Sequence, residues 1–280
     1  MATPSRKSLG FEKILERRSP LDLSGMRSSL RLAVLALVAL SAPLQAWAQD
    51  APIPERFATT WNDTDYPGGD LTTLFNVTLP QCHATCMREE GCAGYTFDQK
   101  NGACFLKDVL GEPVPFEDAL SGVVKQQSAA ALERAQAAAA TMDFLGRSDF
   151  DDALEQAETV AERYQAGKWS EAAWLDTAGE QEPPEATWAT GAAVTVADSG
   201  VAWLAHARAL AVQAESDSNR RFQLNRSAVT AALNAALRLP DAGRAEALLV
   251  MAQALEATYR GEAALGAARL ADRLAPGIAT

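Results

Sequence analysis

The stretch Thr78–Lys107, TLPQCHATCMREEGCAGYTFDQKNGACFLK, decides the fold of the first domain because it holds all four cysteines of the chain. Thr78 and Gln81 fit a capping box, in which each side chain bonds the backbone amide of the other residue. A helix is therefore predicted from about Leu79 to Glu90, with Gly91 in the left-handed conformation that commonly ends helices.

A β-hairpin is predicted directly after this helix. Residues 92–97 alternate between apolar and polar side chains, as a half-buried strand does. The pair Asn101-Gly102 favours a tight turn, and Ala103–Lys107 can return as the second strand. The predicted arrangement is a helix laid across a hairpin.

The spacing of the cysteines favours one of the three possible pairings. Cys82 and Cys86 lie one turn apart on the predicted helix, and Cys86, near the helix end, is close to Cys92. Cys82 is then left to meet Cys104 on the returning strand, which gives nested disulfides. A zinc site is disfavoured because paired C-x2-C knuckles are absent, and a redox-active pair would need a C-x-x-C motif.

These residues resemble the four-cysteine form of the PAN/apple domain. The segments that carry the resemblance are Asp65–Leu71, the helix with two cysteines, Cys92–Phe97 and Cys104–Lys107. The similarity extends over residues 53–126, with Ser121–Val124 as the last strand. The resemblance implies a module that binds proteins or carbohydrates and has no catalytic role. Tyr95, Phe97 and Phe105 form a possible ligand platform, although aromatic side chains on a strand more often belong to the core.

A secretory signal peptide is predicted at residues 26–48. Met26, Arg27 and Arg31 precede an apolar run from Leu32 to Leu40, and small residues stand before a cleavage point after Ala48. Residues 1–25 are interpreted as an over-extended N-terminus, with Met26 as the true start, and the choice between Met1 and Met26 stays open. Export to the periplasm or the extracellular space would favour disulfide formation, with no membrane anchor left after cleavage.

Charge and motif content argue against an enzyme. The formal net charge of −11 disfavours nucleic-acid binding, and two histidines, His83 and His206, leave little for metal or haem ligation. No G-x-S-x-G motif and no glycine-rich phosphate loop occurs, so no catalytic residue, metal or cofactor is predicted. His206 is interpreted as a helix-packing residue.

After about Lys125, alanine becomes abundant and helical periodicity takes over, which predicts an all-α region. We expect a helical hairpin at 127–166, a loop-rich connection at 167–200 and helices at 201–276, which fit either a tetratricopeptide-like (TPR-like) frame or an ordinary alanine-rich bundle. The expected helices are 130–145, 149–165, 201–214, 225–239, 243–259 and 262–274. The predicted fold class is thus a small α+β PAN/apple domain followed by TPR-like helical hairpins.

The order of signal peptide, PAN/apple domain and alanine-rich helices resembles the N-terminal part of bacterial alpha-2-macroglobulin family proteins, which are periplasmic protease traps. This resemblance implies a non-catalytic portion of a protease-inhibitor system. The later β-sandwich domains and the Cys-x-Glu-Gln thioester of that family are not present in these 280 residues. The segment Ala178–Gln181 is similar to the thioester motif, but Ala178 stands where a thioester would need cysteine. The alternative is a stand-alone periplasmic adaptor whose PAN/apple domain binds glycan or protein and whose helices dock a protein partner. Ligand identity and oligomeric state stay open.

Overall fold

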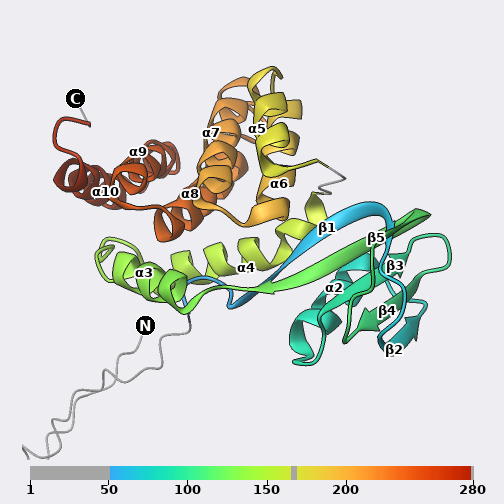
Figure 1. The fold of residues 1–280 in the computed structure, drawn as a ribbon. Coiled ribbons are helices and arrows are strands. Elements are labelled where there is room, and N and C mark those ends of the chain that lie inside the picture. The colour runs from blue at the N-terminus through green and yellow to red at the C-terminus, as the bar shows by residue number, and fades with distance from the viewer. Residues whose placement is uncertain (1–50, 165–168, 279–280) are drawn as a thin grey trace, which may run out of the picture. The chain divides into compact units, whose positions relative to one another are not determined.

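The computed structural model describes residues 51–164 and 169–278, so the predicted signal peptide and the residues before it lie outside the described part (Figure 1). Along the described chain, an antiparallel sheet crossed by one helix comes first and a series of helices follows. This order confirms the predicted fold class of a small α+β domain followed by an all-α region.

The sheet has five strands in the order β1-β5-β3-β4-β2. Their bounds are β1 Arg56–Asp65, β2 Asp70–Phe75, β3 Gly94–Asp98, β4 Ala103–Lys107 and β5 Val114–Gln126. The predicted hairpin is β3–β4, and Gly102 in its turn has a φ of +60°, which glycine adopts at little cost. The strand expected at 121–124 is the last part of β5, whereas β1 and β2 had no clear sequence signal.

Helix α2 (Leu79–Arg88) packs on the face of the sheet that carries Tyr95 and Phe97. Tyr95 pairs with Leu106 and with Gly122 across the two neighbouring strands. A Cβ atom at Gly122 would lie 2.2 Å from the Tyr95 ring, so only glycine leaves room for that ring against β5. The core of this domain contains Ala58, Cys82, Cys86, Cys92, Tyr95, Phe97, Cys104, Leu106 and Leu120.

The C-terminus of α2 differs from the prediction. The helix stops at Arg88, and its cap residue Glu89 is extended (φ −86°, ψ 112°), while Gly91 does not take the left-handed conformation. The reason is Arg56 on β1, whose guanidinium donates hydrogen bonds to the carbonyl oxygens of Met87 and Glu89. These bonds satisfy free carbonyls at the helix end that a left-handed glycine cap otherwise serves.

The helical region contains α3–α10, and its later helices agree closely with the predicted ones. The bounds are α3 Ala129–Ala139, α4 Arg147–Arg163, α5 Glu171–Gly179, α6 Glu185–Ala197, α7 Gly200–Ser216, α8 Arg221–Arg238, α9 Asp241–Ala257 and α10 Gly261–Leu274. Consecutive helices from α7 to α10 pack against one another. Fully buried alanines on α8, such as Ala231 and Ala235, let the neighbouring helices approach closely.

Two predictions for the first helices are wrong. The segment 167–200 is not loop-rich, because it holds α5 and α6. Helix α6 is buried on several sides from Ala189 to Thr195, so it has no amphipathic period for the sequence to display. The expected hairpin of 127–166 also does not form as such, because α3 ends at Ala139 and both α3 and α4 take α8 as their main packing partner.

Asp198 joins the end of the sheet to the helices. It follows α6 with a φ of +46°, and its buried carboxylate forms an ion pair with Arg238 at 2.9 Å. The same carboxylate accepts hydrogen bonds from the Trp203 indole at 2.7 Å and from the Gln127 side chain, just after β5, at 2.6 Å. A single buried acid therefore connects β5, α6, α7 and α8.

Candidate functional site

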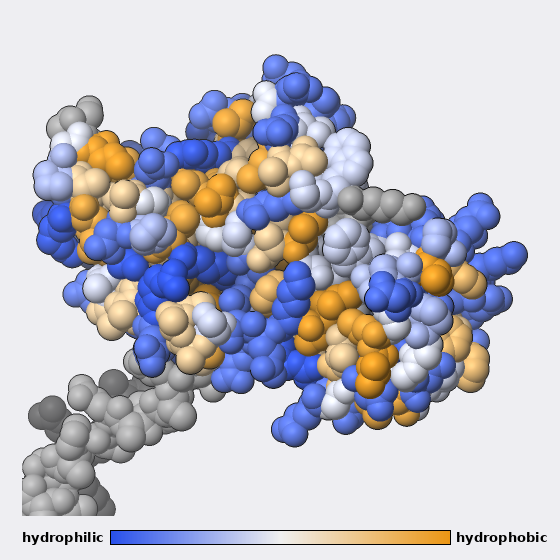
Figure 2. Space-filling model, in the orientation of Figure 1, coloured by the Kyte–Doolittle hydropathy of each residue, from blue (hydrophilic) through white to orange (hydrophobic). Residues whose placement is uncertain are grey.

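A groove with a volume of about 450 Å³ lies where α2 faces the helical region, and we call it the α2–α4 groove. Its walls come from the first residues of β1 and the two residues before it, the outer face of α2, the C-terminal part of α4 and the end of α6. Side chains that line it include Arg56, His83, Met87, Arg88, Glu158 and Glu162. Figure 2 shows hydrophobic residues gathered over α2 and the adjoining strands on this side of the molecule, bordered by hydrophilic ones.

His83 connects three elements at the floor of the groove. Its Nε2 lies 3.2 Å from the Glu158 carbonyl oxygen on α4, and its Nδ1 lies 3.2 Å from the Tyr95 hydroxyl on β3. A carbonyl oxygen can only accept, so Nε2 carries the proton and Nδ1 accepts from Tyr95. Burial lowers the pKa of His83, an effect that the hydrogen bond to Glu158 partly opposes. His83 is therefore a neutral linking residue near neutral pH.

Two carboxylates on α4 give the groove an acidic wall. Partial burial raises the pKa of Glu158, and the neighbouring Glu155 adds to this by charge repulsion. Partial burial also raises the pKa of Glu162, which Arg163 opposes. Desolvated carboxylates gain from a cation or a hydrogen-bond donor, so this wall favours a ligand with such groups.

Arg56 and Arg88 form the opposite, basic side of the groove. Arg56 is committed to structure, because it donates to the carbonyl oxygens of Met87 (3.1 Å), Glu89 (2.9 Å) and Cys92 (2.5 Å). Arg88 is exposed at the end of α2. Of the two guanidinium groups, Arg88 is the one placed to meet a ligand.

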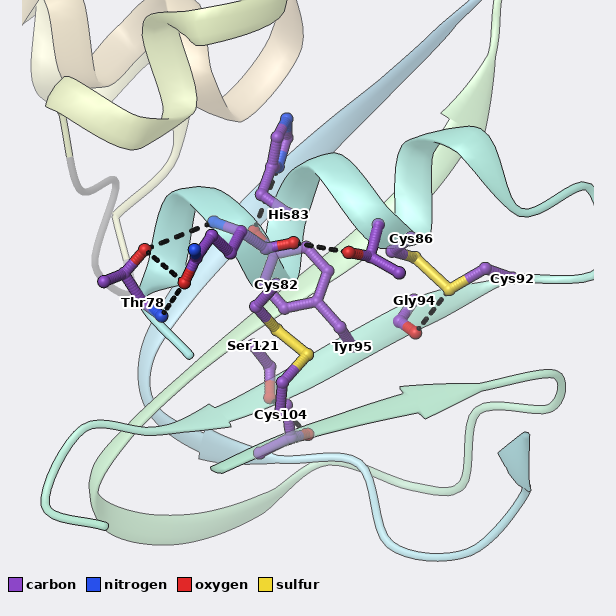
Figure 3. The surroundings of a disulfide bond; sticks show 12 residues. Thr78, Cys82, His83, Cys86, Cys92, Gly94, Tyr95, Cys104 and Ser121 are labelled. Atoms are coloured by element: carbon purple, nitrogen blue, oxygen red, sulfur yellow. Dashed lines mark hydrogen bonds between the residues drawn. A yellow bond between two sulfur atoms is a disulfide. The ribbon is translucent and has the colours of Figure 1, made fainter. Parts of the chain in front are cut away.

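The two disulfides fix α2 in this position (Figure 3). They join Cys82 to Cys104 and Cys86 to Cys92, and this agrees with the predicted nested pairing. The first ties α2 to β4, and the second ties the end of α2 to the segment before β3. Because both bridges leave α2 toward the sheet, its other face, with His83 and Met87, is left for the groove.

The proposed ligand platform of Tyr95, Phe97 and Phe105 does not form. Tyr95 and Phe97 are buried under α2. Phe105 pairs with Thr96, so it points to the opposite face of the sheet, where the ammonium of Lys107 lies 5.7 Å from its ring centroid. Strand alternation separates the three rings, since adjacent residues of a strand point to opposite faces.

On that opposite face, the acidic residues of the segment Asp65–Leu71 have a structural task. The Thr96 hydroxyl donates to Asp65 at 2.7 Å, and the buried Lys107 ammonium donates to Asp70 at 2.6 Å. Lys107 also lies 3.9 Å from Asp65. Buried charges need such partners, so this motif anchors the turn between β1 and β2.

The second histidine, His206, lies on α7 in the helical region. His206 is buried beside Thr190, at 3.0 Å, and packs edge-on against Tyr164, which agrees with a packing role. Within 51–164 and 169–278, no group of three or more potential metal-ligating side chains comes together. None of the described helices combines the length and apolar character needed to cross a bilayer.

Arg56, Glu158 and Glu162 had not been singled out from the sequence. Arg56 meets its partners 31 to 36 residues away, and the carbonyl of Glu158 meets His83 across 75 residues. No local motif marks such long-range contacts, and the acids of α4 look like an ordinary solvated helix face.

A helix stapled by two disulfides across an antiparallel sheet defines the class of small disulfide-stabilised domains, which is typical of proteins outside the cytoplasm. The family model of the PAN domain matches residues 64–107, the part that holds α2, both disulfides and the β3–β4 hairpin. PAN domains are modules that bind proteins or carbohydrates. No curated protein and no solved structure matches the chain.

Proposed function

We propose that this chain is a non-catalytic, exported binding protein whose PAN domain recognises a protein or carbohydrate ligand. The match of residues 64–107 to the PAN domain, together with both disulfides, is the observation that carries this proposal. The α2–α4 groove supports it, because it is a concave surface at the edge of the module.

The ligand contacts would come from α2 and α4. Met87 offers apolar surface and Arg88 an exposed guanidinium on one wall, while Glu158 and Glu162 offer carboxylates on the other. A groove that offers some apolar surface and charges of both signs suits a polar chain that presents donors and acceptors, such as a peptide or an amino sugar.

The experiment uses the full chain with both disulfides formed, screened for binding on a glycan array and against an immobilised peptide library. The variants Arg88→Ala and Glu158→Gln each remove a groove charge, and we expect about tenfold weaker binding, because hydrogen bonds to charged groups contribute about 1.5–3 kcal/mol. Arg273→Ala and Glu256→Gln are matched controls at exposed positions of α10 and α9.

Equal weakening by the control variants would show that general charge, and not the groove, determines binding. If no groove variant weakens binding, the ligand site lies on another face of the PAN domain. A substrate screen that detects turnover would overturn the non-catalytic assignment.

A finer proposal places the chain at the N-terminus of an alpha-2-macroglobulin-like protease-inhibitor system. The order of a PAN domain and alanine-rich helices supports it. Reading the genomic sequence beyond codon 280 tests it: β-sandwich domains in the same or the next reading frame would support the proposal, and unrelated neighbours would refute it.

The alternative is a stand-alone adaptor in which the helices dock a protein partner. Packing of α9 against α10 favours a stacked helical surface of the kind such adaptors use, and the TPR-like frame of residues 201–276 stays a prediction. Co-purification of a partner that is lost when α10 surface residues such as Leu265 are changed to a charged side chain would favour this role.

A further inference from the structure

Three tryptophans meet at the start of α5 and α6, away from the α2–α4 groove. The ring centroids of Trp169 and Trp174 lie 4.7 Å apart, and those of Trp174 and Trp188 lie 5.0 Å apart. Trp174 is only 8% exposed, whereas Trp169 is 49% exposed and Trp188 is 46% exposed. This tryptophan cluster therefore has a buried central ring and a half-exposed ring on each side.

Two of the three tryptophans stand on helices. Trp174 and Trp188 stand on α5 and α6, which pack against each other. Trp169 precedes Ser170, whose side chain caps α5 by accepting from the Ala173 amide at 3.3 Å. Large aromatic rings fixed in this way offer contact area at low conformational cost, and tryptophan is the aromatic residue that attracts cations best.

The described segment that carries the cluster is acidic. Residues 169–207 contain six acids and no lysine or arginine, and the flanking basic residues are Lys168 and Arg208. Asp198 is paired with Arg238, but none of the other five acids forms an ion pair within the described residues. These five are Glu171, Asp176, Glu180, Glu182 and Glu185.

The helix dipoles favour the positions of only some of these five acids. Glu171 and Glu185 lie in the first turns of α5 and α6, where acids are favourable, and each stands three residues before a cluster tryptophan on the same helix face. Asp176 and Glu180, however, lie in the last turn and at the C-cap of α5, where negative charge opposes the helix dipole. These two acids gain nothing from the helix dipole, so a cationic ligand would stabilise them.

We infer that the tryptophan cluster and its acids bind an arginine-rich segment of a partner protein. A guanidinium stacks on an indole face and donates to carboxylates at the same time, which matches both properties of the surface. An oligosaccharide could stack on the rings as well, but a neutral sugar gains little from an excess of carboxylates. This site is separate from the groove proposed for the PAN ligand.

The test measures binding of an acetylated octa-arginine peptide to the full chain by calorimetry and tryptophan fluorescence. An octa-citrulline peptide, which keeps the planar group but lacks the charge, is the ligand control. We expect Trp188→Ala and Trp169→Ala each to weaken octa-arginine binding by about three- to tenfold, as expected for lost cation–π contacts. The double variant Glu180→Gln/Glu182→Gln should weaken it similarly, and the effect should shrink at high salt.

Matched controls separate this site from general acidity. Phe222→Ala removes a ring that is 51% exposed on α8, and Glu256→Gln/Glu262→Gln removes the same charge from α9 and α10. Both variants should bind octa-arginine with an affinity within about twofold of that of the unchanged protein, as surface changes outside a contact do. The inference would be overturned by equal losses of affinity in the control variants or by equal binding of octa-citrulline. It would also be overturned if the oligosaccharide chitohexaose bound in a tryptophan-dependent way and octa-arginine did not bind. The glutamate variant keeps the test decisive if a tryptophan variant fails to fold.

Discussion

His83 Nε2 lies 3.2 Å from the backbone carbonyl oxygen of Glu158, which is 75 residues further along the chain. Because the other nitrogen of the same ring accepts from Tyr95, one imidazole connects the disulfide-bonded helix α2, the sheet and α4. The walls of the α2–α4 groove are therefore held together by a neutral side chain.

Tyr95→Phe should weaken this connection. The change removes the hydroxyl that donates to His83 Nδ1 and leaves a buried acceptor without its partner. We expect the free energy of unfolding in urea to fall by about 1–3 kcal/mol. Tyr259→Phe, at a residue that is 91% exposed, should change it by less than about 0.5 kcal/mol. Equal stability of both variants would show that the Tyr95 hydroxyl contributes nothing to the fold.

Cys104→Ser should free the thiol of Cys82 and leave Cys86–Cys92 intact. The loss of the longer bridge should destabilise the PAN domain by about 2–4 kcal/mol, because the unfolded chain is less constrained. Thiol titration and peptide mapping check the pairing, and unfolding followed by circular dichroism checks stability. The helical region should keep its signal, because no cysteine lies within it. A bridge between Cys82 and Cys86 in the unchanged protein would contradict the structure.

Asp198→Asn should destabilise the junction between sheet and helices. Both side chains of the Asp198–Arg238 pair are 6% exposed, so loss of the negative charge leaves a buried guanidinium uncompensated. Breaking such a pair typically costs about 3–5 kcal/mol. Asp217→Asn removes an acid paired with the more exposed Arg220 and should cost less than about 1 kcal/mol. The fluorescence of Trp203, which donates to Asp198, reports the local change.

Acid should destabilise the helical region through His206. Burial lowers the pKa of His206 to about 4 from the ordinary value of 6.5. Between these values the unfolded state binds the proton and the folded state does not, so this stability is complete above pH 6.5 and falls as the pH drops toward 4. The whole change should amount to about 3 kcal/mol. In His206→Gln the dependence of stability on pH should be shallower over this range. An unchanged pH profile would show that His206 is not buried as a neutral ring.

The sequence by itself determined the local elements of the PAN domain. The capping box at Thr78 and Gln81 begins α2, and the Asn101-Gly102 turn sets the β3–β4 hairpin. With both elements placed, the spacing of the cysteines was enough to give the disulfide pairs. These features depend on residues a few positions apart, so their physics is contained in a short stretch of chain.

Only the tertiary structure decided the site and the first part of the helical region. Strand alternation in the completed sheet sends Tyr95 and Phe105 to opposite faces, and Arg56 on β1 takes over the cap that Gly91 was expected to provide. Helix α6 shows no amphipathic period because neighbours cover it on several sides, and the groove forms only where α4 meets α2. Contacts over tens of residues depend on how the elements pack, and no local pattern in the sequence records that packing.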